Sequence, residues 1–306
     1  MLTMDVVFTQ ILVILLYILV GYVAGKCRLV NADQRKYLTT LCTSLILPFT
    51  IVSASNQTLT PRQIANLGLS LALMLGLFAA TTFAVTGLLR RAPRPARVTL
   101  ASLITYPNCT FLGLPLCRAL FGDIGILYNA VAMVAFNVLF FTWQVSAFSG
   151  SSFRLKNLAT PGTIATLVLL AMLFARIQFP APVQTVVSSI GSMITPLSLI
   201  IIGVMMSENR LGLILKERRT YAVTLLRNIA IPLISLPLIR LLPGDSAARL
   251  CQLVYIACPC ATLTSIYAIQ YDMEPELAAR SVVMSTLCFA GSLPLVLSIG
   301  MRFLGT

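Results

Sequence analysis

The residues best suited to chemistry stand in one stretch, 104–115, which reads Ile-Thr-Tyr-Pro-Asn-Cys-Thr-Phe-Leu-Gly-Leu-Pro. It lies inside an apolar run long enough to cross a bilayer, yet Pro107 and Pro115 each remove a backbone donor and clash with the preceding turn. In hydrocarbon such a break is tolerated only where protein or a watery cavity surrounds it. The second half of the chain has a similar interrupted run at 256–265, Ile-Ala-Cys-Pro-Cys-Ala-Thr-Leu-Thr-Ser. Two interrupted apolar segments at corresponding positions indicate the binding site of a secondary transporter.

The composition predicts an all-α polytopic membrane protein embedded in the lipid bilayer. Of 306 residues, 58% are apolar and 10% are charged, with a mean hydropathy of +0.92, whereas soluble proteins average about 25% charged. The net charge of +13 comes from basic residues between apolar runs. Because the positive-inside rule accounts for this pattern, no nucleic-acid partner is expected.

Ten segments have roughly the 17–25 residues that an α-helix needs to cross a bilayer. They are residues 5–24, 35–55, 63–89, 98–120, 125–148, 161–177, 183–207, 220–241, 247–270 and 277–303. The first is followed, not preceded, by its cations, so it is interpreted as a spanning helix rather than a signal peptide.

The distribution of cations predicts the orientation in the plasma (cell inner) membrane. With both termini outside, the cytoplasmic loops hold fifteen Lys and Arg residues and the external side holds six. The cytoplasmic set is Lys26, Arg28, Arg35, Lys36, Arg90, Arg91, Arg94, Arg97, Arg154, Lys156, Arg210, Lys216, Arg218, Arg219 and Arg280.

The loop at 149–160 divides the chain into two five-helix halves, 1–148 and 161–306. An odd number of crossings in each half means that any structural repeat must be inverted. Three pairs of residues at similar separations support the repeat, namely Pro107 with Pro259, Met133 with Met284, and Pro48 with Pro196.

The stretch Pro107-Asn108-Cys-Thr-Phe111-Leu-Gly113-Leu-Pro115 resembles the Asn-x-x-Phe-x-Gly-x-Pro signature of the auxin efflux carrier family, within the bile-acid/auxin transporter superfamily. Leu47-Pro48, residues 195–203, Pro259, Ser285-Thr286 and Leu293-Pro294 are also similar to that family's pattern. The resemblance implies two inverted five-helix repeats, with the fourth and ninth helices broken and crossing at the midplane.

The same resemblance implies a scaffold of helices one, two, six and seven, and a mobile transport unit of helices three to five and eight to ten. Plant members export indole-3-acetate, and bacterial members are tied to malate, malonate and related acids. This chain lacks the long central loop of the plant exporters, so it is most similar to the prokaryotic permease-like branch. A homodimer through the scaffold is a further expectation.

The charge inventory of the spans favours an organic anion as substrate. All nine acidic residues lie at segment ends or in loops, whereas an intramembrane cation site normally supplies carboxylates. Neutral donors and the N-termini of broken half-helices suit an anion. The predicted substrate-binding residues are Asn108, Pro107, Thr105, Thr110, Gly113, Pro259, Cys260, Thr262, Ser265 and Arg227, and the predicted crossover prolines are Pro107, Pro115 and Pro259.

Each of these residues also has a structural interpretation. Asn108 can donate to a carboxylate or satisfy backbone groups that the prolines free. The threonine and serine hydroxyls can bond back to their own helices. Arg227 can contact an anion or gate, snorkel to the surface, or bond to helix ends. Gly68, Gly76 and Gly87 are expected at close helix contacts, and Asn137 and Gln144 in bonds between helices.

The leading hypothesis is a secondary carrier of small organic anions, with carboxylates such as malate and malonate preferred to auxin-like aromatic acids. The alternative is a channel-like pore or a membrane receptor for a small carboxylate on the same fold. The chain has no histidine and no intramembrane carboxylate pair, so no enzyme activity, cofactor or metal is expected. Proton coupling, sodium coupling and uniport all remain open at this point.

Overall fold

The computed structural model describes residues 4–152, 158–208, 214–243 and 245–305. Within these ranges the regular structure is helical, apart from one isolated antiparallel bridge between Pro107 and Cys260. Part of the expected connecting loop at 149–160 and the cations Arg154, Lys156 and Arg210 lie outside the described residues.

The helices of the first half follow the expected segments closely. They are α1 (Met4–Lys26), α2 (Ala32–Leu41), the π-helical η1 (Cys42–Ile46), α3 (Leu47–Val52), the 3₁₀ turn η2 (Ser53–Asn56), α4 (Pro61–Leu88), α5 (Arg94–Thr105), the π-helical η3 (Cys109–Gly113), α6 (Leu114–Leu139), the π-helical η4 (Phe140–Gln144) and α7 (Val145–Ser149).

The helices of the second half are α8 (Pro161–Ala175), α9 (Ala181–Ser192), α10 (Ile194–Ser207), α12 (Arg218–Leu225), the π-helical η6 (Leu226–Ala230), α13 (Ile231–Ile239), α14 (Ser246–Ala257), α15 (Thr262–Gln270) and α16 (Pro275–Leu304). Asparagine or threonine caps start several helices, as at Asn31 before α2 and Thr60 before α4.

Length and hydropathy identify seven membrane-span candidates among the described residues, together with the shorter apolar helix Pro161–Ala175. One candidate, Cys109–Ser149, is 41 residues long. It bends at Gly122, whose φ of 64° and ψ of −141° lie outside helical geometry and are readily adopted by glycine.

Three of the π-helical turns end directly before a helix whose second residue is proline. The pairs are η1 with Pro48, η3 with Pro115, and η6 with Pro232. A proline inside a helix removes one backbone hydrogen bond and clashes with the carbonyl four residues earlier. A local i→i+5 turn relieves that clash while the chain stays helical, so these prolines modify their spans without ending them.

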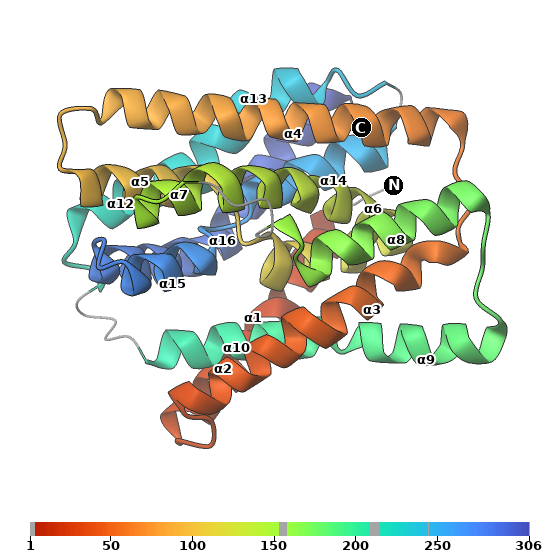
Figure 1. Ribbon diagram of the computed structural model, residues 1–306, viewed down its shortest axis with the longest axis horizontal. Helices are drawn as coiled ribbons and strands as arrows, with labels where there is room; N and C mark the ends of the chain where they lie inside the picture. The colour runs from red at the N-terminus through yellow and green to blue at the C-terminus, as the bar shows by residue number, and fades with distance from the viewer. Residues whose placement is uncertain (1–3, 153–157, 209–213, 244, 306) are drawn as a thin grey trace.

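The broken segments lie inside the molecule. Figure 1 shows α4 along one long edge and α9 and α10 along the opposite edge, with α5, α6, α14 and α15 between them. The largest hydrophobic cluster takes many of its residues from α6 and α14, including Leu116, Ile126, Val254 and Tyr255. The interrupted backbone is therefore surrounded by protein, as a break at membrane depth requires.

The expectation for the α4 glycines was wrong. A Cβ at Gly68, Gly76 or Gly87 would have no neighbour within 4 Å, so these glycines do not sit at a close helix contact. The close contact lies between α1 and α10. A Cβ at Gly203 would stand 2.0 Å from the carbonyl oxygen of Ile18, and one at Gly21 would stand 2.1 Å from that of Ile200.

We expect Gly203→Val to destabilise the protein strongly, because the obstructing atoms belong to the backbone of α1 and cannot move aside. The matched control is Gly76→Val, which adds the same side chain where there is open space. Detergent thermal melting of both variants measures the difference. Equal melting temperatures for Gly203→Val and Gly76→Val would contradict the close α1–α10 packing.

Candidate binding site at the helix breaks

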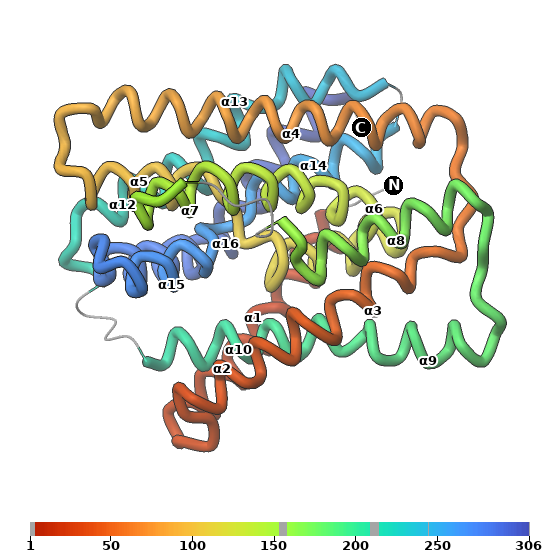
Figure 2. Tube along the Cα trace, viewed as in Figure 1, coloured from red at the N-terminus to blue at the C-terminus, as the bar shows by residue number. Residues whose placement is uncertain are grey.

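The two interrupted segments meet and pair through their backbones. The Asn108 N–H donates to the Pro259 carbonyl at 2.7 Å, and the Ala261 N–H donates to the Tyr106 carbonyl at 3.0 Å. The extended links between α5 and η3 and between α14 and α15 lie near the middle of the long axis (Figure 2). Pro107 and Pro259 both stand in these links, where a missing N–H interrupts no helix. The predicted breaks at Pro107 and Pro259 are present, whereas Pro115, the third predicted crossover proline, is the second residue of α6 and does not break the helix.

Arg227 joins the ends of the two broken helices. Its Nη1 donates to the carbonyls of Ile104 at 3.1 Å and Thr105 at 2.7 Å, at the end of α5. Its Nε donates to the Cys258 carbonyl at 3.1 Å, and its Nη2 donates to that of Ile256, at the end of α14. C-terminal carbonyls lack intrahelical donors and carry the negative end of the helix dipole, so one guanidinium satisfies both ends.

The burial of Arg227 decides between its alternative roles. The side chain is 0% exposed, which rules out snorkelling to the surface. Its hydrogen bonds all go to backbone carbonyls, so bonding to helix ends accounts for its position. These four bonds stabilise the ends of the two broken helices, and the anion contact of Arg227 stays a prediction.

The side-chain amide of Asn108 keeps its donor group, Nδ2, unused. Its Oδ1 accepts from the Phe111 N–H at 3.4 Å, and its backbone carbonyl accepts from the Gly113 N–H at 3.0 Å. Its Nδ2 is buried and has no hydrogen-bond partner among the described residues, and the whole residue is only 3% exposed. A buried amide donor without a partner costs free energy, which a ligand acceptor would recover.

The carbonyl that Pro115 frees is satisfied from another helix. Pro115 removes the donor for Phe111, four residues earlier, and the Ser198 hydroxyl of α10 donates to the Phe111 carbonyl at 2.8 Å. The Asn108 side chain is therefore not needed to satisfy that carbonyl. Sequence reasoning missed Ser198, although it stands in the 195–203 stretch that carried part of the family resemblance.

Several predicted residues shape the crossover through backbone or local contacts. The Cys260 N–H donates to Ser285 Oγ at 3.1 Å. The Thr105 hydroxyl accepts from Thr82 Oγ1 at 3.4 Å, and the Thr110 hydroxyl lies 3.7 Å from the Met133 sulfur.

Gly113 packs closely against the break that follows α14. A Cβ at this position would stand 3.2 Å from Asn129 Nδ2 and 3.3 Å from Cys258 Sγ. Sequence reasoning did not single out Asn129. Its Oδ1 is buried without a partner among the described residues, beside the predicted glycine.

Thr262 and Ser265 line a cavity of about 290 Å³ that adjoins the crossover. They stand in the first turn of α15, whose N-cap Ala261 makes no side-chain cap bond. Neither hydroxyl bonds to another described residue. Phe111, which donates its N–H to Asn108, also lines the cavity. Thr262 and Ser265 are thus available to a ligand, whereas the neighbouring Thr264 hydroxyl is paired with Ser102 at 2.7 Å.

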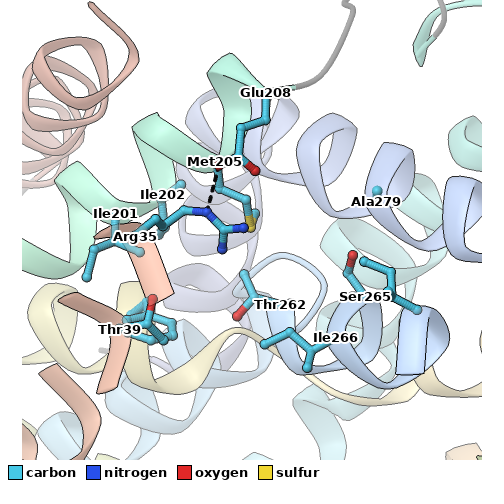
Figure 3. Close-up of a pocket in the computed structure, with 12 residues that line it drawn as sticks. Arg35, Thr39, Ile201, Ile202, Met205, Glu208, Thr262, Ser265, Ile266 and Ala279 are labelled. Atoms are coloured by element: carbon cyan, nitrogen blue, oxygen red, sulfur yellow. Dashed lines mark hydrogen bonds and ion pairs between the residues drawn. The ribbon is translucent and has the colours of Figure 1, made fainter. Parts of the chain in front are cut away.

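The opposite wall of the cavity was not predicted as part of a site. Figure 3 shows Arg35 of α2 and Glu208, at the end of α10, on one side and Thr262 and Ser265 on the other. Arg35 and Glu208 form an ion pair at 2.8 Å. The apolar part of the lining comes mainly from Ile201, Ile202, Met205, Ile266 and Ile269.

The two helix-bonding amides behave as expected. Asn137 Nδ2 donates to the hydroxyls of Thr163 at 2.8 Å and Thr160 at 3.2 Å, and Gln144 Nε2 donates to the Val98 carbonyl at 3.0 Å. Asp123, next to the kink of α6 at Gly122, and Asp272, in the turn after α15, are both exposed.

The apolar spans and the internal pairing of two broken helices define an integral membrane protein of the transporter class. The family model described as "Membrane transport protein" matches residues 6–164 and 147–297. The chain belongs to this family, which supports the resemblance drawn from the motifs. No match was found among curated proteins.

Proposed function

We propose that the protein is a secondary carrier of small organic anions, of the prokaryotic malate- and malonate-permease-like branch of its family. The single observation that best supports this is the unpartnered Nδ2 of Asn108, a buried neutral donor at the point where two broken helices meet. An amide there can hold a carboxylate without the cost of burying an uncompensated charge.

The proposed architecture has ten crossings arranged as two inverted five-helix repeats, 1–148 and 161–306, with both termini outside the cell. Three features support it. The seven long candidates are complemented by Pro161–Ala175 and by the short pair α14 and α15. The 41-residue candidate is kinked at Gly122 and is long enough for more than one pass. Pro107 and Pro259 occupy corresponding places in paired links.

Transport would proceed by an elevator-type movement of helices three to five and eight to ten against a scaffold of helices one, two, six and seven. The tight backbone contact of α1 with α10 suits a rigid scaffold. Arg227, which joins the ends of α5 and α14, would keep the two broken helices together as one moving unit. A homodimer through the scaffold and proton or sodium coupling are parts of the proposal that rest on the family resemblance.

A thermal-shift panel on the purified full-length protein tests this function. Malonate, malate, citrate, acetate and indole-3-acetate are compared with and without sodium and across pH. A ligand at about 100 times its dissociation constant adds about 2.7 kcal/mol of stability, so the cognate acid should raise the melting temperature by several degrees. The proposal fails if no carboxylate stabilises the protein while an amine or a sugar does.

A channel-like pore or a receptor on the same fold is the second candidate. The enclosure of the crossover favours the carrier, because alternating access requires an occluded central site. Asn108 and the paired links are buried on all sides, which does not suit a continuous water-filled path.

A further inference from the structure

The cavity beside the crossover carries a fixed positive charge that the proposed function does not yet use. Arg35 is the fourth residue of α2, which begins at the capping box of Asn31 and Gln34. Its guanidinium faces the cavity, and its side chain is 21% exposed (Figure 3). Arg35 is the cation among the lining residues of this cavity.

A carboxylate of the protein itself already contacts this guanidinium. Arg35 Nε donates to Glu208 Oε1 at 2.8 Å, and this is the one hydrogen bond that joins the pair. The Glu208 side chain is 34% exposed, and ion pairs of this exposure are weak. A single-contact, solvent-accessible pair is readily exchanged for another carboxylate, whereas a planar guanidinium can hold an incoming one bidentately.

The cavity is also lined by hydroxyl donors that make no hydrogen bond to the described residues. Thr39 Oγ1, on the Arg35 side, is buried without a partner. The Thr262 and Ser265 hydroxyls on the facing wall likewise bond to no described residue. Three hydroxyls and a guanidinium around about 290 Å³ can hold a small acid with two charged ends.

We propose that this cavity is a second anion site of the carrier, in which the Arg35 guanidinium binds one carboxylate of a small dicarboxylate and Glu208 is the carboxylate that the ligand displaces. This inference rests on the proposed function, and it goes further by naming the residue that selects for dianions. The second carboxylate lies toward the hydroxyls of α15, beside Phe111 and the crossover. Monocarboxylates use only one of the two walls and bind more weakly.

Binding and structural roles of the ion pair predict different results. If the pair only ties α2 to α10, neutralising either member has the same destabilising effect. If Glu208 competes with substrate for Arg35, the two substitutions have opposite effects. Arg35→Gln should weaken malonate or malate binding about tenfold or more, and Glu208→Gln should strengthen it about two- to fivefold.

The experiment measures ligand-induced thermal shifts and the KM for radiolabelled uptake into proteoliposomes, with malonate, malate and acetate as probes. The control is Lys36→Gln, the neighbouring cation on α2, whose side chain is 73% exposed and whose partner is Asp33 at 3.5 Å. It should leave dissociation constants and KM unchanged. Acetate, whose single carboxylate can bind at the Thr262 and Ser265 wall instead, should lose less affinity in Arg35→Gln than malonate does.

The inference is overturned if Arg35→Gln and Glu208→Gln change dicarboxylate affinity in the same direction, or if neither changes it more than Lys36→Gln does. If Arg35→Gln fails to fold, Glu208→Gln alone tests the inference. Only the displacement of Glu208 by the ligand predicts that this variant binds dicarboxylates more tightly. A wild-type protein that binds no carboxylate contradicts the proposed function itself. If the wild type binds a carboxylate, but Arg35→Gln does not weaken and Glu208→Gln does not strengthen that binding, only this inference is contradicted.

Discussion

Asn108→Ala is expected to reduce kcat/KM for the transported acid by roughly 10- to 150-fold, because a hydrogen bond to a charged group contributes about 1.5–3 kcal/mol. The variant removes the one amide donor at the crossover that has no partner among the described residues. It also removes the Oδ1 that accepts from Phe111 at 3.4 Å, a long contact whose loss should cost little stability. Uptake into proteoliposomes gives kcat and KM, and thermal melting checks the fold.

Asn108→Asp separates an amide contact from a merely structural role. It keeps the shape and the Oδ1 acceptor but places negative charge where the substrate's carboxylate is expected. Transport should be at least as weak as in Asn108→Ala at neutral pH and should recover partly in acid, as the introduced carboxyl becomes protonated. Normal anion transport by Asn108→Asp at neutral pH would show that Asn108 does not bind the carboxylate.

The matched control for both variants is Asn137→Ala. Asn137 is also a buried amide, 6% exposed, but its Nδ2 is taken by Thr163 at 2.8 Å and Thr160 at 3.2 Å. We expect this control to lose stability while its KM stays near that of the wild type. A rise in KM equal to that of Asn108→Ala would mean that any buried amide in these helices affects transport.

Arg227→Met is expected to have the largest effect on stability. It leaves four buried carbonyls at the ends of α5 and α14 without their donor, and each orphaned group costs about 1–3 kcal/mol. Because these carbonyls flank the paired breaks, the crossover should loosen together with the fold. The measurements are the melting temperature and the yield of folded protein in detergent. Arg227→Met should strongly lower the melting temperature and give little folded protein.

Arg227→Lys distinguishes charge from geometry at the same position. Lysine keeps a positive charge near both helix ends but lacks the planar fork that reaches four acceptors. It should recover part of the lost stability and remain clearly below the wild type. A melting temperature for Arg227→Met equal to that of the wild type would contradict the role assigned to Arg227.

The sequence was sufficient to predict the breaks, because proline chemistry is local. Pro107 and Pro259 identify the two extended links, and apolar run lengths place most helix ends within a few residues of those observed. The π-helical turns before Pro48, Pro115 and Pro232 were not predicted. A proline indicates that a helix is disturbed, but neighbouring helices decide whether it ends or only bulges.

The details of the site depend on contacts between distant segments, which a single sequence does not specify. The role of Arg227 remained open because its acceptors are 29 to 123 residues away. Arg35 and Glu208 are separated by 173 positions. In the sequence, each is a charged residue at the end of a predicted segment, with nothing to indicate that they pair. The α4 glycines were assigned to close packing from composition alone, whereas the backbone contact of Gly21 and Gly203 depends on which helices become neighbours.

The most direct test of the central claim, that this chain is an organic-anion carrier, is counterflow in proteoliposomes. Vesicles containing the purified protein are loaded with the unlabelled acid that gives the largest thermal shift, and uptake of external labelled acid is followed over time. A carrier predicts saturable uptake that transiently exceeds equilibrium in loaded vesicles and is abolished or strongly reduced by Asn108→Ala. Uptake that is linear in concentration and indifferent to internal acid would contradict the claim and identify a pore.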